Sequence, residues 1–330
     1  MNTFGKLFKL SIFGESHGTN VGIIIDGVPA GIPLLQSDFF ADLARRKSGA
    51  KGTTPRTEAD EPHIISGVFN DHTTGAPVTV LFENTNTRSH DYSFLKEIPR
   101  PGHADFVASR KFGGFEDYRG GGHFSGRLTL GIIAAGVIAK KIIAPIHVES
   151  KLNEAGGITD IQKAIDLAVE RGDSIGGIIE TKASNMPVGL GEPFFDSLES
   201  CLSHIVFAIP ATKGIEFGSG FAAAKMTGTQ HNDKYISDTG KTETNYAGGI
   251  NGGISNGNDL IFRVAIKPTS STHQKQRTMN MKTGKMIDLE IEGRHDTCIA
   301  LRIPVVIEAA TCIVLADFMI QAQKVKLINA

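Results

Sequence analysis

Cysteine and tryptophan are scarce in this sequence, and neither sign of charge is in excess. Tryptophan is absent, and the cysteines Cys201, Cys298 and Cys312 are too few and too scattered for a disulfide framework or a zinc site. The formal net charge is −1, whereas proteins that coat DNA or RNA usually carry a basic excess. These absences exclude a disulfide-stapled scaffold, disfavour nucleic acid as a partner, and fit a reducing cytoplasm.

Targeting and membrane-spanning segments are lacking too. The N-terminal run MNTFGKLFKLSIFGESHG has no continuous apolar stretch followed by a small-residue cleavage site. No apolar run approaches the roughly 20 residues of a membrane span. The 330 residues, 40% of them hydrophobic, suffice for a sizeable core, and no Pro/Ser-rich linker divides them. We therefore expect a single domain over residues 1–330, located in the cytoplasm and bound to no membrane.

Glycine is the abundant residue. The 38 glycines gather in clusters, without a collagen-like period or a low-complexity tract. Such clusters mark places where the backbone bends sharply or approaches a ligand closely. Several clusters in one chain favour a ligand-binding enzyme over a scaffold, and here they are GGFEDYRGGG, GLGEP, GIEFGSG and GGINGGISNG.

The order of predicted elements is mixed. Apolar runs predict a β-hairpin over residues 6–30, and alternation predicts a strand over 259–268. The Ala- and Ile-rich run 129–143 predicts a buried helix, and Pro304 suits the first turn of a long C-terminal helix. Because no regular βαβ alternation occurs, we predict the α+β class rather than a doubly wound α/β fold. Each half has strands and a glycine-rich segment before an apolar helix, a loose echo that is consistent with an internal duplication.

Two histidines lie in polar, glycine-bounded turns between apolar runs. His17 lies in GESHG (residues 14–18), where a turn requires the glycines but no histidine. His103 lies in RPGHADF beside Arg100, with Asp105 placed to orient it. A single loop histidine is more often bonded to backbone, but two in this setting favour acid–base chemistry, because imidazole titrates nearest neutral pH.

Three further segments concentrate donors for anions. A glycine-rich loop that opens a helix can cradle a phosphate or carboxylate, and it can equally be a plain helix start. One such loop, YRGGGHFSGRLT, carries Arg119, His123, Ser125 and Arg127. KPTSS (267–271) and GRHD (293–296) add more donors, although a turn and a structural ion pair are their plainer interpretations. Together these segments describe a site for a polyanionic small molecule, without metal-ligand spacing such as HExxH.

These residues alone are also compatible with three other functions. GSGFAA (218–223) matches a dinucleotide fingerprint and would mean a dehydrogenase, although no βαβ unit returns after it. A protein that binds phosphorylated ligands without chemistry is a second alternative. ARRKSGAKG (44–52) is the sole hint of a nucleic-acid binder and is more simply a loop that closes over an anionic substrate.

Eight short motifs occur in one order across nearly the whole chain. Each is weak alone, but together they make residues 5 to about 320 similar to the chorismate synthase family: GESHG, RSHDYS, RPGHAD, YRGGGxFSGR, VGLGEP, GGISNG, KPTSS and GRHD. The resemblance implies a sandwich of antiparallel β-sheets surrounded by helices, assembled as a homotetramer.

The resemblance also implies a reaction. Family members catalyse the last step of the shikimate pathway to aromatic amino acids. In it, 5-enolpyruvylshikimate 3-phosphate loses phosphate and a ring hydrogen by 1,4-anti elimination, giving chorismate. They use reduced FMN without net redox change, as carbon–oxygen lyases acting on phosphate, and NADPH is a candidate reductant of the flavin. The two carboxylates and one phosphate of this substrate would account for the arginines.

The site residues follow from the same resemblance. His17 would donate a proton to the departing phosphate, His103 would protonate reduced flavin near N1, and Asp296 would help the flavin N5 region act as a base. The implied substrate-binding residues are Ser16, a candidate relay for His17, and Arg46, Arg100, Arg127 and Arg294. The implied cofactor-binding residues are Arg46, His123, Phe124, Ser125, Gly252, Lys267, Pro268, Thr269, Ser270, Ser271 and Arg294.

The sequence departs from the family pattern at two places. His123 and Phe124 stand where many members have an arginine and a serine, so we expect the flavin phosphate to be held differently. Lys51 stands where arginine is common in the loop after Arg46, and lysine lacks the bidentate fork that a pyridine nucleotide contact would use.

Overall fold

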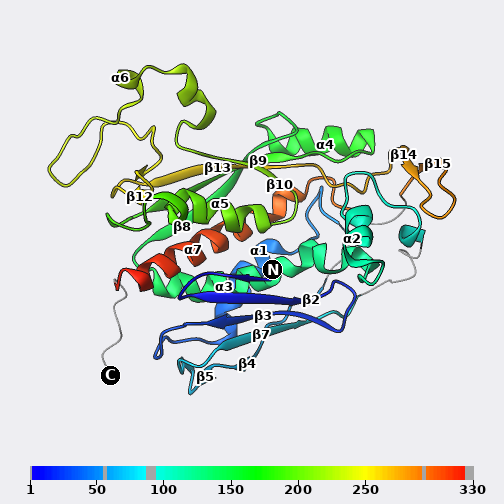
Figure 1. Cartoon of the computed structure of the whole chain (residues 1–330), viewed down its shortest axis with the longest axis horizontal. Coiled ribbons are helices and arrows are strands. Elements are labelled where there is room, and N and C mark those ends of the chain that lie inside the picture. Colours follow the sequence, from blue (N-terminus) through cyan, green and yellow to red (C-terminus); the bar gives the residue numbers. More distant parts are fainter. Residues whose placement is uncertain (1, 55–57, 87–93, 292–294, 324–330) are drawn as a thin grey trace.

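Two antiparallel sheets face each other across two long helices (Figure 1). The computed structural model describes residues 2–54, 58–86, 94–291 and 295–323. In spatial order, the first sheet contains β1 (Thr3–Phe4), β2 (Lys9–Gly14), β3 (Asn20–Asp26), β7 (Val78–Glu83) and β4 (His63–Ser66). The second contains β10 (Thr212–Phe217), β13 (Leu260–Ile266), β9 (Gly177–Ser184) and β8 (His147–Ala155).

Helices and short hairpins complete the fold. The α-helices are α1 (Phe40–Arg46), α2 (Asp105–Phe112), α3 (Thr129–Ile142), α4 (Ile161–Arg171), α5 (Leu198–Ala208), α6 (Gly228–His231) and α7 (Pro304–Gln321). The 3₁₀ turns are η1 (Gln36–Phe39), η3 (Arg119–Phe124), η4 (Gly126–Leu128), η5 (Phe194–Asp196), η6 (Gly220–Lys225) and η7 (Ile299–Arg302). The small hairpins are β5 (Val68–Phe69) with β6 (His72–Thr73), β11 (Ile250–Asn251) with β12 (Ile254–Ser255), and β14 (Gln276–Met279) with β15 (Met286–Leu289).

The predicted α+β class and its antiparallel sheets are confirmed. The predicted N-terminal hairpin is β2–β3, in which Leu10 pairs with Ile25. Along β3, Ile23 and Ile25 are buried while Ile24 is 40% exposed, the alternation expected of a sheet with one face on the core. Each half of the chain contributes one sheet and then one long apolar helix, the order that an internal duplication would produce.

The two central helices approach closely because small residues line their contact. α3 and α7 pack on each other, α3 against the first sheet and α7 against the second. A Cβ added to Gly136 of α3 would lie 2.4 Å from the Cβ of Ala309 in α7, a distance that real side chains do not reach. Glycine therefore sets the separation of the two helices. The helices form the two middle layers of the fold, and each has one sheet on its outer side.

The expectation that no apolar run approaches the length of a membrane span is wrong for α7, which is apolar and long enough to cross one, but 83% of it is buried within the fold. Its two carboxylates bind other parts of the protein. Glu308 accepts hydrogen bonds from both Nη atoms of Arg45 (2.5 and 2.6 Å), and Asp317 accepts three from the backbone of residues 6–8 (2.7–2.9 Å). α7 is thus a core helix that ties the N-terminal hairpin and α1 to the second sheet.

Two sequence motifs do not form the structures that would support the alternative functions. GSGFAA follows β10 as a turn and the short 3₁₀ segment η6, and β10 runs antiparallel to β13, so no parallel βαβ unit surrounds it. In ARRKSGAKG, Arg45 pairs with Glu308 and Lys51 with Asp166 (2.6 Å). These charges are engaged within the protein.

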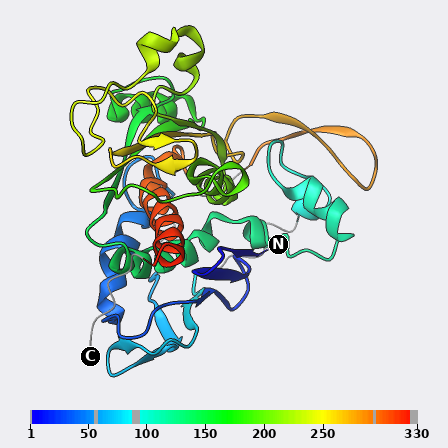
Figure 2. The same cartoon turned by 60° about the vertical axis from the view of Figure 1, so that its left-hand side comes forward.

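One arm extends from the body. Figure 2 shows the β14–β15 hairpin and α2 reaching outward on the same side. The hairpin is joined to the segment before α2, because Met281 N–H donates to the carbonyl of Glu97 (2.8 Å) and the Thr278 hydroxyl donates to that of Pro99 (2.5 Å).

Gly136→Ala should destabilise the protein by forcing α3 and α7 apart. We expect a loss of about 1–3 kcal/mol from overpacking, reduced by up to about 1 kcal/mol because alanine favours helix. Urea unfolding of the variant measures the difference. Gly228→Ala in α6 is the control, since nothing lies within 4 Å of its added Cβ; equal stability of the two variants would contradict the close contact.

Candidate active site

A cavity of about 730 Å³ opens where α3 and α7 begin. Most of the predicted site residues line it: Ser16, Arg46, Arg100, His103, His123, Phe124, Ser125, Arg127, Lys267, Pro268, Thr269, Ser270, Ser271 and Asp296. His17 and Gly252 are not among the lining residues, and Gly252 lies at the turn of the β11–β12 hairpin. Arg294, like the motif RSHDYS (88–93), lies outside the described residues.

Both central helices direct their N-terminal ends to this cavity. Leu128 and Thr129 at the start of α3, and Ile303 at the start of α7, are lining residues. Neither helix has a side-chain N-cap. The first N–H groups of a helix carry partial positive charge and attract anions. The fold thus supplies two positive helix ends before any charged side chain is counted.

A buried carboxylate holds two of the predicted substrate-binding arginines. Asp60 pairs with Nη1 of Arg127 and lies 3.5 Å from Nη1 of Arg46. Arg127 also donates from Nε to the Asn84 side chain (2.6 Å) and from Nη2 to the carbonyl of Glu83 (2.9 Å). Asp60 was not predicted, although its loop has basic residues followed by acidic ones.

Positive charge around Arg46 exceeds what the nearby carboxylates balance. Arg46 is 6% exposed and donates to the Thr129 hydroxyl (2.9 Å) and to the carbonyl of Gly126 (2.8 Å). Burial lowers the pKa of Arg46 to about 9, and the neighbouring charges of Arg302 and Arg127 contribute to the lowering. An anion in the cavity would relieve this repulsion.

The imidazole of His103 is oriented by a second buried carboxylate, as the sequence suggested. His103 Nδ1 lies 2.5 Å from Asp105 Oδ1, and Arg100 binds the same carboxylate through Nε (2.8 Å) and Nη2 (2.9 Å). Burial alone would raise the pKa of Asp105, but the hydrogen bonds from Arg100 and His103 outweigh it and hold that pKa well below its usual range. The ionised carboxylate therefore binds Nδ1, while Nη2 of Arg100 lies 3.1 Å from Nε2.

Two imidazoles pack against one glycine loop. Gly120, Gly121 and Gly122 have φ of 58°, 82° and 52°, a region that favours glycine. A Cβ on Gly120 would lie 2.4 Å from the His17 ring, and one on Gly121 would lie 3.5 Å from the His103 ring. Two neighbouring residues of one loop therefore each lie against one of the two rings.

His17 lies one layer behind the cavity wall. It is 6% exposed and does not line the cavity, whereas its neighbours Ser16 and Gly120 do. The loop holds this turn at two points: Ser16 N–H donates to the carbonyl of Gly122 (3.1 Å), and His123 Nδ1 lies 2.8 Å from that of Gly14. The His123 ring thus braces the turn that carries His17.

The opposite wall carries an ammonium group and hydroxyls. Lys267 donates from Nζ to the carbonyl of Gly102 (2.9 Å) and to the Ser270 hydroxyl (3.0 Å). Burial lowers the pKa of Lys267, and the charge of Lys213, another lining residue, adds to this. This wall can therefore receive a second anionic group.

Asp296 lies in the same wall, held in place by other residues. Its carboxylate accepts from the Thr54 N–H (3.0 Å) and lies 3.3 Å from Nη1 of Arg302. The Thr269 hydroxyl donates to the backbone carbonyl of Asp296 (2.8 Å).

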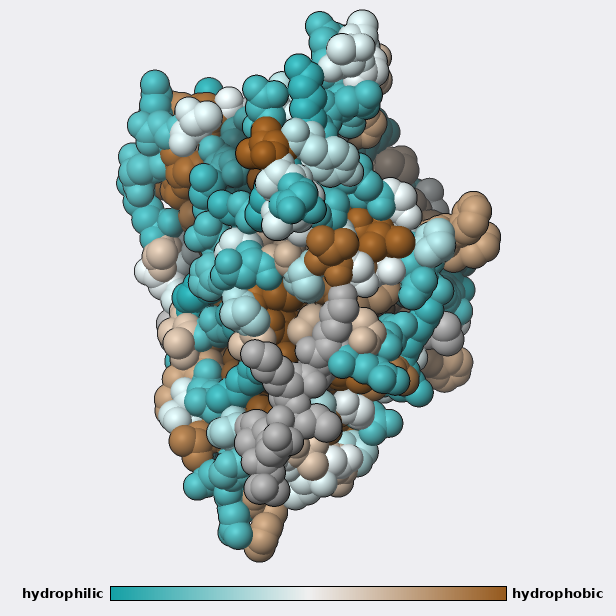
Figure 3. Space-filling view, turned by 90° about the vertical axis from the view of Figure 1, so that its left-hand side faces the viewer, coloured by the Kyte–Doolittle hydropathy of each residue, from teal (hydrophilic) through white to brown (hydrophobic). Residues whose placement is uncertain are grey.

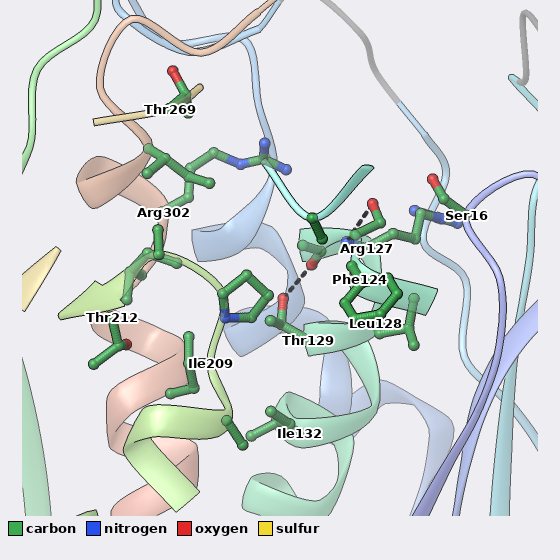
Figure 4. A pocket seen from close by; sticks show the side chains of 18 of the residues that line it. Ser16, Phe124, Arg127, Leu128, Thr129, Ile132, Ile209, Thr212, Thr269 and Arg302 are labelled. Carbon is green, nitrogen blue, oxygen red and sulfur yellow. Dashed lines mark hydrogen bonds between the residues drawn. The ribbon is translucent and has the colours of Figure 1, made fainter. Parts of the chain in front are cut away.

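Part of the cavity is apolar, and sequence reasoning did not anticipate this part. Figure 4 shows Ile132, Ile209 and Leu128 around the lower half, below Arg127 and Arg302. Pro210 and Ile303 belong to the same lining. These residues come from α3, the α5–β10 connection and the start of α7, so their meeting depends on tertiary structure. A flat ring with a charged substituent fits such a divided cavity.

Surplus guanidinium charge, two helix N-termini and two imidazoles define an anion-binding site suited to acid–base chemistry, the kind of site found in enzymes. A family model described as chorismate synthase matches residues 8–320. A chorismate synthase of Chitinophaga pinensis is 63% identical over 325 residues, 98% of each chain, and one of Dehalococcoides mccartyi is 48% identical over 97% of each. The chain belongs to the chorismate synthase family, a family of enzymes, and the resemblance seen in its motifs is confirmed.

A solved structure supports the fold. It is described as "Crystal Structure of Chorismate Synthase" and superposes with a TM-score of 0.74, covering 96% of this chain and 93% of that chain at 24% sequence identity.

Gly120→Ala should displace the His17 ring, whereas Gly121→Ala should not. Both substitutions place alanine at positive φ, so they share the backbone strain, but only the first adds a Cβ within 3 Å of an imidazole. We expect Gly120→Ala to be less stable than Gly121→Ala by about 1–3 kcal/mol and to shift the His17 imidazole signals in NMR spectra. Equal stability and unmoved His17 signals would refute the packing described here.

The low pKa of Asp105 should appear in the pH dependence of stability. A carboxyl with a depressed folded-state pKa stabilises the protein above its unfolded value, about 3.9, and this contribution is lost as the pH falls toward the folded value. Asp105→Asn should therefore be less stable than wild type at pH 7, with the difference shrinking below about pH 4. Urea unfolding across this range tests it, with Asp288→Asn at an exposed ion pair as the control. A difference that does not change with pH would count against the pairing.

Proposed function

We propose that this protein is a chorismate synthase, a carbon–oxygen lyase acting on phosphate. It eliminates phosphate and a ring hydrogen from 5-enolpyruvylshikimate 3-phosphate in the 1,4-anti sense and gives chorismate. This is the last step of the shikimate pathway to aromatic amino acids, and it uses reduced FMN without net redox change. The observation that carries the proposal is the convergence of His17 and His103 on one glycine loop beside an arginine-rich cavity, in a chain of this family.

The proton transfers are assigned by the family resemblance, and the positions of the side chains support the assignment. His17 supplies the proton for the departing phosphate through Ser16, because Ser16 lines the cavity and His17 lies behind it. His103, which Asp105 and Arg100 orient, is the proton donor to the flavin N1 region by the same resemblance. Asp296, held by Thr54 and Arg302, is the residue that helps the flavin N5 region act as a base. Arg46, Arg100 and Arg127, with Arg294 by resemblance, hold the anionic substituents of the substrate.

The division of the cavity into an apolar part and a part with cationic and hydroxyl groups supports FMN as a ligand. An apolar part that includes Ile209 and Pro210 suits the ring system, and Lys267 with the hydroxyls of 269–271 suits a phosphate. Reduced FMN, when bound, supplies electron density and takes part in removing the ring hydrogen. The proposed contacts that line the cavity are Arg46, His123, Phe124, Ser125, Lys267, Pro268, Thr269, Ser270 and Ser271, with Gly252 and Arg294 assigned by resemblance alone.

We further propose a cytoplasmic homotetramer, with NADPH as a candidate reductant of the flavin. The three cysteines are free thiols. Contiguous apolar patches on a surface mark contacts between proteins, and the adjacent Phe194 and Phe195 in η5 are 86% and 94% exposed. Figure 3 shows apolar side chains interrupting the hydrophilic surface on one side. Light scattering after gel filtration should give four times the chain mass.

The activity is tested under anaerobic conditions with reduced FMN and 5-enolpyruvylshikimate 3-phosphate. We expect release of chorismate and phosphate in equal amounts, slowed on the order of 10²- to 10⁴-fold by His17→Ala, because a general acid is lost. His147→Ala, at an exposed position in β8, is the control. A folded protein that binds both ligands but releases no phosphate would be a binding protein without chemistry, and the proposal would be wrong.

A further inference from the structure

Most arginines predicted to bind substrate already donate hydrogen bonds to acceptors within the protein. Nε, Nη1 and Nη2 of Arg127 each have a protein acceptor. Arg100 donates from Nε and Nη2 to Asp105 and from Nη1 to the Ser271 hydroxyl (3.1 Å). These side chains are fixed in place, and they contribute charge to the cavity more readily than new hydrogen bonds.

Arg302 differs from them. It lies at the end of η7, immediately before α7, and was not predicted from the sequence. Its Nε donates to the backbone carbonyl of Arg46 (2.9 Å), and Nη1 lies 3.3 Å from both carboxylate oxygens of Asp296. Among the described residues none accepts from Nη2. The guanidinium is thus oriented from one side and keeps donors on the other.

The free side of this guanidinium is directed at the cavity. Arg302 lines it, and in Figure 4 the side chain extends from the α7 side toward Arg127. Its charge is close enough to that of Arg46 to oppose protonation there, so the two cations share one region. The uncapped N-terminus of α7 begins two residues later and adds positive potential.

We propose that Arg302 is a further substrate-binding residue, whose Nη2 donates to a carboxylate or phosphate oxygen of the bound ligand. The contact to Asp296 holds the guanidinium at the angle this requires. The identity of the ligand rests on the proposed function, whereas the binding of an anion by Arg302 does not.

The test compares full-length wild type with Arg302→Gln, Arg302→Lys and the control Arg263→Gln. Arg263 pairs with Glu216 in the second sheet and does not line the cavity. Calorimetric titration with 5-enolpyruvylshikimate 3-phosphate should give a Kd raised on the order of 10- to 100-fold in Arg302→Gln, the worth of one charge-assisted hydrogen bond. Arg302→Lys should weaken binding less, because it keeps the charge but loses the planar fork, and Arg263→Gln should bind as wild type does.

The steady-state constants separate binding from positioning. If Arg302 binds substrate, KM should rise by more than kcat falls. A fall in kcat with Kd unchanged would mean that Arg302 acts only by holding Asp296, and this would overturn the proposal. Should Arg302→Gln fail to fold, as judged by circular dichroism, Arg302→Lys decides: wild-type affinity in that variant refutes the role.

A probe independent of the reaction separates this inference from the proposed function. If wild type releases no phosphate from the substrate, the same proteins are titrated with inorganic phosphate. Weaker phosphate binding by Arg302→Gln than by wild type and Arg263→Gln would support the residue's role even then. If folded Arg302→Gln binds phosphate as tightly as wild type does, the proposed role of Arg302 is wrong.

Discussion

The contact between α3 and α7 is the constraint on which the site depends. Gly136 lets the helices touch through backbone and methyl groups, and the sheets then cover their outer faces. With this spacing, both helices begin at the same end of the molecule, beside the turn that follows β2 and the strand that precedes Lys267. Segments far apart in the sequence therefore supply one cavity.

Within that cavity, buried carboxylates organise the cations. Asp60 holds Arg46 and Arg127, Asp105 holds Arg100 with His103, and Asp296 holds Arg302. Burying these ions is costly unless each is paired and hydrogen-bonded, and here the pairs fix the positive charge of the arginines around a shared cavity. The glycine loop adds the other requirement of acid–base chemistry, because residues without side chains let one loop pack against two imidazoles.

Local patterns predicted much of this structure. Alternation and apolar runs located β2–β3, β13, α3 and α7, since short-range hydrophobic periodicity determines such elements. The motifs named most of the residues that line the cavity. The sequence did not predict Asp60, Arg302 or the apolar lining. No local pattern distinguishes a lone carboxylate, an arginine in an apolar run or an isoleucine at a helix end. Gly252 was assigned by resemblance alone, and it does not line the cavity.

α3 and α7 point the same way, so their like-signed ends lie side by side. Parallel neighbours of this kind repel, and the guanidinium groups at the same end increase the repulsion. A polyanion bound there would stabilise the folded protein, because its binding free energy is added to the free energy of unfolding. The resistance of the folded protein to proteolysis would then rise with the concentration of the anion that binds there.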